Sequence, residues 1–159
     1  MAIYPGEKCE PLIEFRNAWL SAPLVWNALS MKYLGHKPYL FSGLDALWDL
    51  WKRGDIPEPV RAVHMMTFDR AYVMRKDYAK AASNIREFLR EFPDINPADN
   101  HWCSIAAYYD LNPKVPAIGL WCTSVSQNPF LGEWNEEKEE YGPLDWNTAF
   151  DLYAELGSL

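Results

Sequence analysis

The longest amphipathic stretch of the chain runs over residues 71–92, and any fold must cover its apolar side. On a helical wheel that side carries nine apolar residues: Ala71, Met74, Tyr78, Ala81, Ala82, Ile85, Phe88, Leu89 and Phe92. Charged residues occupy the other side, and this 3.6-residue periodicity predicts a long helix with one buried face. We expect Asp69 to cap its first turn and Pro93 to end it. The rest of the chain would then pack around this central helix.

Shorter amphipathic runs predict further helices around 10–22, 23–34, 43–53, 101–111 and 144–156. The run 60–68 fits either a helix or a buried strand, because periodicity cannot decide so short a segment. Residues 117–125 alternate as a strand does, and both of its sides are largely apolar, as in a strand inside a fold. The expected fold class is therefore α+β and mainly helical. It is a single domain over 1–159, with about six helices around 71–92 and a small β element near 117–125.

The composition is that of a globular protein. The chain has 159 residues, of which 49% are hydrophobic and 23% charged, enough to bury a core without disulfides or metals. Charged residues interrupt any apolar run near the start, so no signal peptide is expected. The longest uncharged windows, 17–31 and 115–132, carry polar residues and do not resemble membrane spans. Three cysteines without repeating spacing argue against a disulfide framework, and together these features predict a cytoplasmic protein with no membrane partner.

The net charge of −7 is concentrated at one end of the chain. Residues 1–132 contain 14 acidic and 14 basic residues, whereas 133–159 contain eight acids against Lys138 alone. A local acidic surface produces a field that can steer a cationic partner, whereas a diffuse one would only favour solubility. Clustered surface glutamates also occur simply for solubility, and that interpretation stays open.

Large aromatic residues lie among these acids, which distinguishes the segment from a purely solubilising tail. The predicted partner-binding residues are Glu133, Trp134, Glu136, Glu137, Glu139, Glu140, Tyr141, Asp145 and Trp146. Aromatic side chains supply binding energy by desolvation, and surrounding acids set the register of a basic partner. The chain has eight tryptophans, more than a core of this size ordinarily uses, so some are expected at the surface.

No familiar catalytic, nucleotide-binding or metal motif occurs in the sequence. The eight glycines form no G-x-G-x-x-G or Walker pattern, and H-E-x-x-H, paired C-x-x-C and G-x-S-x-G are absent. His101 and Cys103, with Cys122 downstream, come nearest to a metal or nucleophile cluster, but residues two apart on a helix point in different directions. His64 lies in an apolar run, where a hydrogen-bonded core histidine is the commoner role. We therefore predict no catalytic residue, no metal and no cofactor.

Two polar groups remain as weaker candidates for binding. A neutral cluster follows the predicted strand and forms a possible ligand loop: Thr123, Ser124, Ser126, Gln127 and Asn128. Basic residues line the polar side of 71–92, but acids are interleaved with them, and the chain as a whole is acidic. This pattern is typical of a solvated helix face, so direct nucleic-acid binding is not expected.

The sequence favours a non-catalytic protein-binding module that docks its acidic-aromatic segment, 133–159, on a basic protein partner. A nucleic-acid-handling protein is one such partner, since carboxylates can stand in for phosphates, and small virus-encoded inhibitors act in this way as a class. One alternative is a small enzyme with an unrecognised site around His64, His101, Cys103 or the loop 123–128. A second alternative is a structural subunit whose tryptophans form a homo-oligomer interface.

Overall fold

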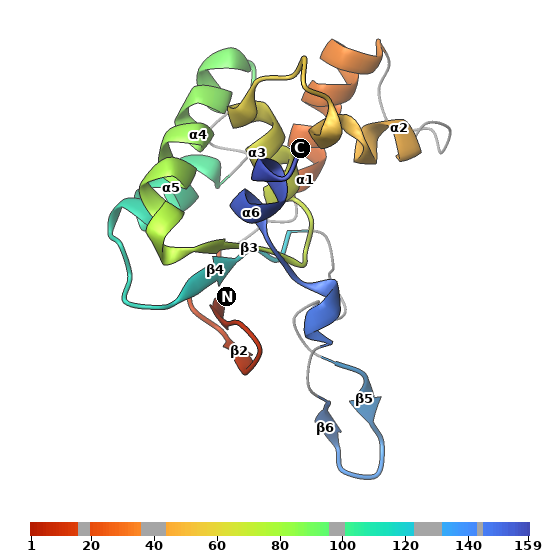
Figure 1. Ribbon diagram of the computed structural model, residues 1–159, viewed down its shortest axis with the longest axis vertical. Coiled ribbons are helices and arrows are strands. Elements are labelled where there is room, and N and C mark those ends of the chain that lie inside the picture. The colour runs from red at the N-terminus through yellow and green to blue at the C-terminus, as the bar shows by residue number, and fades with distance from the viewer. Residues whose placement is uncertain (16–19, 36–43, 96–100, 123–131, 143–144) are drawn as a thin grey trace.

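A computed structural model describes residues 1–15, 20–35, 44–95, 101–122, 132–142 and 145–159, which form an α+β fold (Figure 1). The described helices are α1 (Ser21–Leu29), α2 (Leu44–Trp48), α3 (Glu58–Met66), α4 (Tyr78–Glu91), α5 (Trp102–Asp110) and α6 (Leu152–Gly157). The described strands are β1 (Ala2–Tyr4), β2 (Lys8–Glu10), β3 (Ala71–Met74), β4 (Ala117–Gly119), β5 (Trp134–Asn135), β6 (Glu140–Tyr141) and β7 (Phe150–Asp151). Shorter helical turns lie at Ser30–Leu34, Leu50–Lys52, Arg75–Asp77 and Trp146–Thr148. None of the described helices is both long and apolar enough to cross a membrane.

A mixed five-stranded sheet brings together strands from both ends of the chain. Its order is β2-β1-β4-β3-β7, and every pair is antiparallel except β3 with β7, which run parallel. Strand β3 has a neighbour on each side, with Val73 opposite Ile118 of β4 and Tyr72 opposite Asp151 of β7. The segment between β4 and β7 therefore leaves the sheet on one side of β3 and returns to it on the other.

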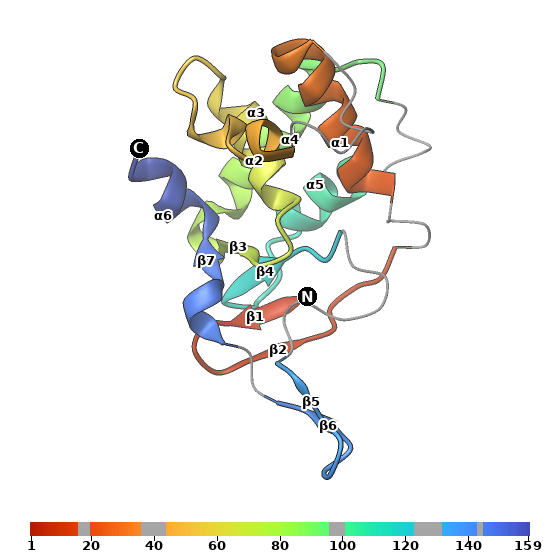
Figure 2. The same ribbon diagram turned by 90° about the vertical axis from the view of Figure 1, so that its right-hand side faces the viewer.

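The helices lie over one face of this sheet, as Figures 1 and 2 both show. Helix α4 packs against both α3 and α5. Its residues Ala81 and Ala82 are fully buried, and their small side chains let the neighbouring helices approach closely. Trp102 of α5 is also fully buried, and its Nε1 donates a hydrogen bond of 3.1 Å to the Ser21 carbonyl. That bond ties α5 to the start of α1.

Residues 71–74 of the predicted central helix form strand β3 instead, so the prediction of a helix over 71–92 is wrong at its start. Ala71 and Val73 are buried while Tyr72 and Met74 are half-buried, which is the alternation of a strand. Strands on both sides pair with the backbone groups of β3, and these non-local bonds replace the helical ones. The α-helix begins only at Tyr78. From there the predicted buried face is confirmed, because Tyr78, Ala81, Ala82, Ile85 and Phe88 are all buried.

Asp69 does not cap a helix, contrary to the prediction. Its carboxylate accepts a hydrogen bond of 2.9 Å from the backbone N–H of Cys122, which fixes the chain just after β4. The predicted strand 117–125 is reduced, within the described residues, to β4, and residues 123–125 lie outside them. The ambiguous run 60–68 proves to be mostly helix α3.

The predicted helices at the two ends of the chain are also different in the structure. Of the run 10–22, Glu10 belongs to β2 and 11–15 are not helical, while 16–19 lie outside the described residues. The run 144–156 is broken into the turn Trp146–Thr148, strand β7 and helix α6. The carboxylate of Asp151 accepts hydrogen bonds from the N–H groups of Tyr153 and Ala154, at 3.1 and 3.4 Å, so the helix starts there.

The packing of α4 gives a direct test of the fold. Phe88 is fully buried, and its ring centroid lies 4.8 Å from that of Phe92. We expect Phe88→Ala to lower the free energy of unfolding by about 3–5 kcal/mol, because it removes apolar contacts and leaves a cavity. Arg90→Ala, on the exposed side of the same helix, should change it by less than about 0.5 kcal/mol. Urea denaturation measures both, and equal losses in the two variants would contradict the buried face of α4.

Candidate functional site

An antiparallel hairpin made of β5 and β6 projects away from the helices and the main sheet (Figures 1 and 2). Trp134 pairs with Tyr141, and Asn135 pairs with Glu140. Two further backbone bonds extend the ribbon at its base: Gly132 N–H to the Gly142 carbonyl at 3.0 Å, and Gly142 N–H to the Glu133 carbonyl at 2.8 Å. Every residue from 133 to 141 is exposed, so the hairpin contributes no side chain to the buried core.

The tip of the hairpin is ordered by the side chain of Asn135. Its Oδ1 accepts hydrogen bonds from the backbone N–H groups of Glu137 and Lys138, each at 3.0 Å. Asparagine commonly stabilises turns by bonding to N–H groups two and three residues further along the chain. Glu139 completes the turn with a positive φ of 50°, in the left-handed region. These hydrogen bonds within the hairpin stabilise the turn over residues 136–139.

Two aromatic rings pack against each other across the hairpin. The ring centroids of Trp134 and Tyr141 are 5.0 Å apart at an interplanar angle of 66°, an edge-to-face contact. Such a pair contributes about 0.5–1.5 kcal/mol beyond area burial, which stabilises the ribbon itself. The two residues nevertheless remain 49% and 42% exposed. Because strand residues alternate between faces, Glu133 and Glu140 lie on the opposite side of the ribbon from the rings.

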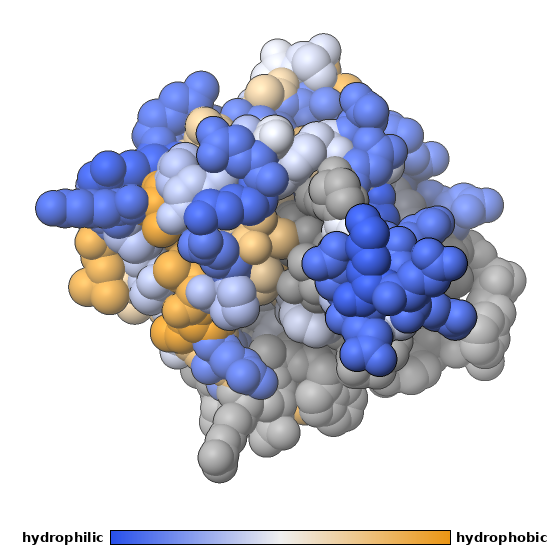
Figure 3. Space-filling model, turned by 90° about the horizontal axis from the view of Figure 1, so that it is seen from below, coloured by the Kyte–Doolittle hydropathy of each residue, from blue (hydrophilic) through white to orange (hydrophobic). Residues whose placement is uncertain are grey.

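The hairpin is strongly acidic. Over 133–141 it carries five glutamates against one lysine: Glu133, Glu136, Glu137, Glu139 and Glu140 against Lys138. None of these glutamates forms an ion pair within the described part of the chain, in which eight other ion pairs occur. Figure 3, seen from below, shows a compact hydrophilic group where the hairpin comes nearest to the viewer. The negative charge of the hairpin therefore lies on the outer surface of the protein, away from the core.

Asp145 and Trp146, also predicted to bind a partner, lie outside the hairpin. Trp146 is half-buried and packs against a small cluster of Ile3 and Ala117, on the sheet face turned away from the helices. Asp145 accepts a hydrogen bond of 3.0 Å from the N–H of Asn147 and so caps the turn that follows it. Both residues have structural roles in this arrangement. The other seven predicted partner-binding residues lie on the hairpin.

The residues considered for metal binding or cysteine catalysis lie in different environments. Cys103 is exposed on α5, whereas Cys122 is buried, and burial raises the pKa of its thiol to about 12. The ring of His101 stacks on Phe15 with centroids 5.1 Å apart. The described residues contain no group of three or more His, Cys, Asp or Glu side chains that could hold a metal ion. The predicted ligand loop, Thr123, Ser124, Ser126, Gln127 and Asn128, lies outside the described residues.

His64 is buried on α3 among aromatic rings. Its ring is stacked with that of Trp48, with ring centroids 6.3 Å apart. It also makes an edge-to-face contact with the ring of Phe68, with centroids 5.0 Å apart. Neither ring nitrogen has a hydrogen-bond partner within the described part of the chain. Burial lowers the pKa of His64 to about 4, so the ring is neutral near pH 7. This environment suits a packing residue rather than a proton-transfer group that must exchange protons with a substrate.

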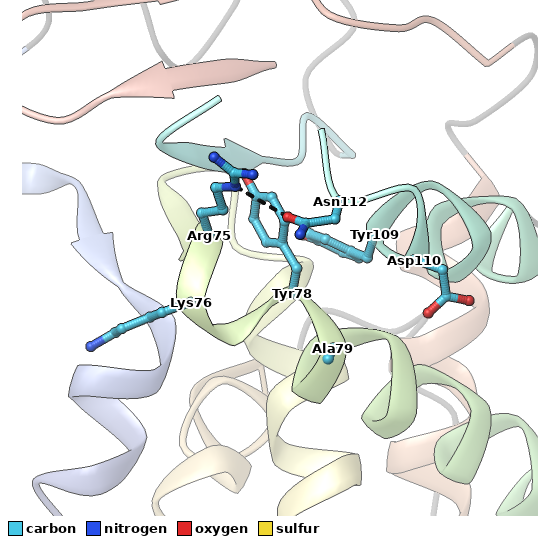
Figure 4. A pocket seen from close by; sticks show the side chains of 7 residues that line it. All are labelled: Arg75, Lys76, Tyr78, Ala79, Tyr109, Asp110 and Asn112. Carbon is cyan, nitrogen blue, oxygen red and sulfur yellow. Dashed lines mark hydrogen bonds between the residues drawn. The ribbon is translucent and has the colours of Figure 1, made fainter. Parts of the chain in front are cut away.

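An open hollow of about 600 Å³ lies where the start of α4 meets the end of α5 (Figure 4). It is lined by Arg75, Lys76, Tyr78, Ala79, Tyr109, Asp110 and Asn112. Arg75 donates from Nε to Asn112 Oδ1 at 3.1 Å, and Asp110 is paired with Arg86. Lys76 and Asp110 point away from each other in Figure 4. The charged groups of the hollow therefore bond within the protein or diverge, and they do not converge on a ligand.

The sequence analysis missed the hairpin, although a signal for it was present. The sequence predictions above include no strand over 133–141. The pattern W-N-x-x-x-x-x-Y, with aromatics at both ends and an asparagine before the polar turn, is that of two short strands joined by an Asn-containing turn. Asn135, which orders that turn, was not among the predicted site residues.

The burial of His64 predicts a pH dependence of stability. Its pKa is about 4 in the folded protein and about 6.5 in an unfolded chain, so the unfolded state binds more protons between these values. We expect the free energy of unfolding to fall by about 3 kcal/mol from this residue as the pH drops from 6.5 to 4. Denaturant unfolding across this range measures it. His64→Leu should show a smaller decrease, and an identical decrease in both proteins would contradict the assignment.

The three thiols should react at very different rates in the folded protein. Cys103 is exposed, Cys9 is half-buried with its pKa raised by burial, and Cys122 is buried with its pKa near 12. Because the thiolate is the reactive form, iodoacetamide should modify Cys103 first and Cys122 only after unfolding. Mass spectrometry of peptides from briefly treated protein identifies the modified residue. Equal labelling of Cys122 and Cys103 under native conditions would contradict this order.

Comparison with known proteins finds no relative: no protein-family model matches the chain, and no curated protein or solved structure is significantly similar to it. What the chain does must therefore be inferred from its own residues.

Proposed function

We propose that this protein is a non-catalytic protein-binding module that docks the β5–β6 hairpin on a basic partner protein. The observation that carries the proposal is an ordered ribbon, exposed over its whole length, that places two aromatic rings and five glutamates outside the core. Ordering a chain segment costs conformational entropy, and burial in the core does not compensate for it here. A partner that covers the ribbon supplies the missing contacts.

The placement of the hairpin along the chain supports this role. It lies in the segment between β4 and β7, and both of these strands pair with β3. A connection held at both ends by a sheet is a common place for binding residues, because the scaffold fixes the loop without using its side chains. In this proposal the sheet and helices form one domain over 1–159 that presents the hairpin, and the protein acts in the cytoplasm with its thiols reduced.

The charge of the hairpin supports a basic protein as the partner. The hairpin has a net charge of −4 over nine residues, while residues 1–132 are neutral overall. Such a concentrated field accelerates association with a basic surface and opposes association with an acidic one. Nucleic-acid-handling proteins carry basic surfaces of this kind, and the hairpin carboxylates would occupy the positions of phosphates there. The protein would then act as a competitive inhibitor of nucleic-acid binding.

The basic side of α4 is a weaker candidate for a binding surface than the hairpin. Lys80 pairs with Glu58 at 2.8 Å, Arg86 pairs with Asp110, and Arg90 lies 3.9 Å from Glu87. These cations are largely balanced within the chain, so they offer little net charge to nucleic acid or to the hairpin of another copy. The glutamates of the hairpin have no such partners within the described residues, which makes the hairpin the stronger candidate.

The test is an affinity capture from a cell lysate with a neutralised hairpin and a matched control. The hairpin variant combines Glu136→Gln, Glu137→Gln, Glu139→Gln and Glu140→Gln. The control removes four charges elsewhere on the exposed surface, by Glu7→Gln, Glu14→Gln, Asp94→Asn and Glu155→Gln. We expect the native protein and the control to recover the same basic protein, and the hairpin variant to recover at least about tenfold less.

Salt provides the second arm of this experiment. Recovery by the native protein should fall as the salt concentration rises from about 0.05 to 0.5 M, because added ions screen the exposed charges. Thermal unfolding should be the same for all three proteins, which separates lost binding from lost folding. A partner that binds the hairpin variant and the native protein equally would overturn the proposal.

A further inference from the structure

The aromatic pair of the hairpin has a free surface that its contacts within the chain do not explain. Trp134 and Tyr141 meet edge to face, so the contact uses the edge of one ring and leaves ring surface open on the same side of the ribbon. About half of each residue remains exposed. A role in stabilising the hairpin explains why the two rings contact each other. It does not explain why two large aromatic residues remain exposed among five glutamates.

We propose that this pair is a binding site for an arginine side chain of the partner, with the guanidinium lying flat on a ring within the negative potential of the hairpin glutamates. The inference rests on the proposed function and specifies what the hairpin recognises. The face of an aromatic ring carries negative potential, and tryptophan attracts cations most strongly. The glutamate charges around the pair add to that potential.

Within the described residues, no cation of this chain occupies the faces of these two rings. Elsewhere lysines lie over aromatic rings, with Lys8 5.0 Å from the ring centroid of Tyr4 and Lys80 4.7 Å from that of Tyr153. No cation lies over Trp134 or Tyr141 within the described part of the chain. Lys138, in the turn of the same hairpin, does not fill the position either. A cation from another molecule can therefore reach the rings.

Arginine suits this site better than lysine. Its guanidinium is planar and weakly hydrated, so it stacks on a ring while its N–H groups remain free in the same plane to bond to other acceptors. The lysine ammonium is compact and strongly hydrated and would lose more solvation on the ring. In a second copy of this chain Arg53 is paired with Asp55, Arg86 with Asp110, and Arg75 with Asn112. Arg90 is exposed and lies 3.9 Å from Glu87, so a second copy is tested as an alternative donor below.

The experiment measures binding of a hexa-arginine peptide and a hexa-lysine peptide by calorimetry at low salt. We expect the native protein to bind the arginine peptide more tightly. Trp134→Leu/Tyr141→Leu keeps apolar side chains but removes the rings, and it should weaken arginine binding about threefold or more. Trp134→Phe/Tyr141→Phe keeps two rings and should retain most of the affinity. If the leucine variant binds the arginine peptide as tightly as the native protein, the inference is overturned.

The leucine variant could lose binding because its hairpin unfolds, so a second measurement uses NMR spectroscopy of the native protein. The indole N–H resonance of Trp134 is identified as the one lost in Trp134→Phe, and it should shift when the arginine peptide is added. A resonance that stays in place while the backbone amides of 136–140 shift would overturn the inference and leave the proposed function standing.

Two further outcomes are distinguishable. If neither peptide binds, and neutralising the four glutamates leaves capture of the partner unchanged, both the inference and the proposed function are wrong. If the native protein sediments as a dimer that the leucine variant does not form, the occupant is a second copy, and the assignment of an arginine from a different protein is overturned.

Discussion

The pairing of strand β3 with neighbours on both sides is the constraint on which the rest of this structure depends. β3 joins β4, which follows α5, to β7, close to the end of the chain. Its buried residues Ala71 and Val73 face the helices, and α4 begins immediately after the turn that follows it. Backbone hydrogen bonds to two partners fix this segment as a strand, and the positions of α4 and α6 follow from it because both helices adjoin strands of the same ladder.

The same pairing explains how the hairpin is presented. The chain leaves β4, forms the ribbon of β5 and β6, and returns as β7 on the opposite side of β3. The ribbon is then stabilised by its own contacts: the bonds from Glu137 and Lys138 to Asn135, and the edge-to-face rings of Trp134 and Tyr141. An isolated two-stranded hairpin is only marginally stable in water. Its order and its binding of a partner would therefore be thermodynamically linked, since covering the rings also stabilises the ribbon.

Tryptophans in this chain lie in two different environments that their sequence context does not separate. Trp102 is fully buried and bonds to the backbone of α1, and Trp146 packs on the sheet beside Ile3. Trp134 lies among similar acidic neighbours to Trp146 in the sequence, yet it is half exposed on the ribbon. The surplus of tryptophans correctly suggested that some are exposed. Nearness to the sheet does not decide which of them are exposed, because Trp121, just after β4, is also 40% exposed.

The sequence alone determined the features that depend on local order and charge. These are the buried face of α4 from Tyr78 to Phe88, the acidic character of 133–141, and the presence of aromatic residues within it. The tertiary structure decided that 71–74 is a strand and that the last helix begins only after Asp151. It also decided that Trp146 packs on the sheet and not on the hairpin. The reason is physical: Ala71 and Met74 fit a helical stripe as well as a strand, and only hydrogen bonds to residues far along the chain decide between them.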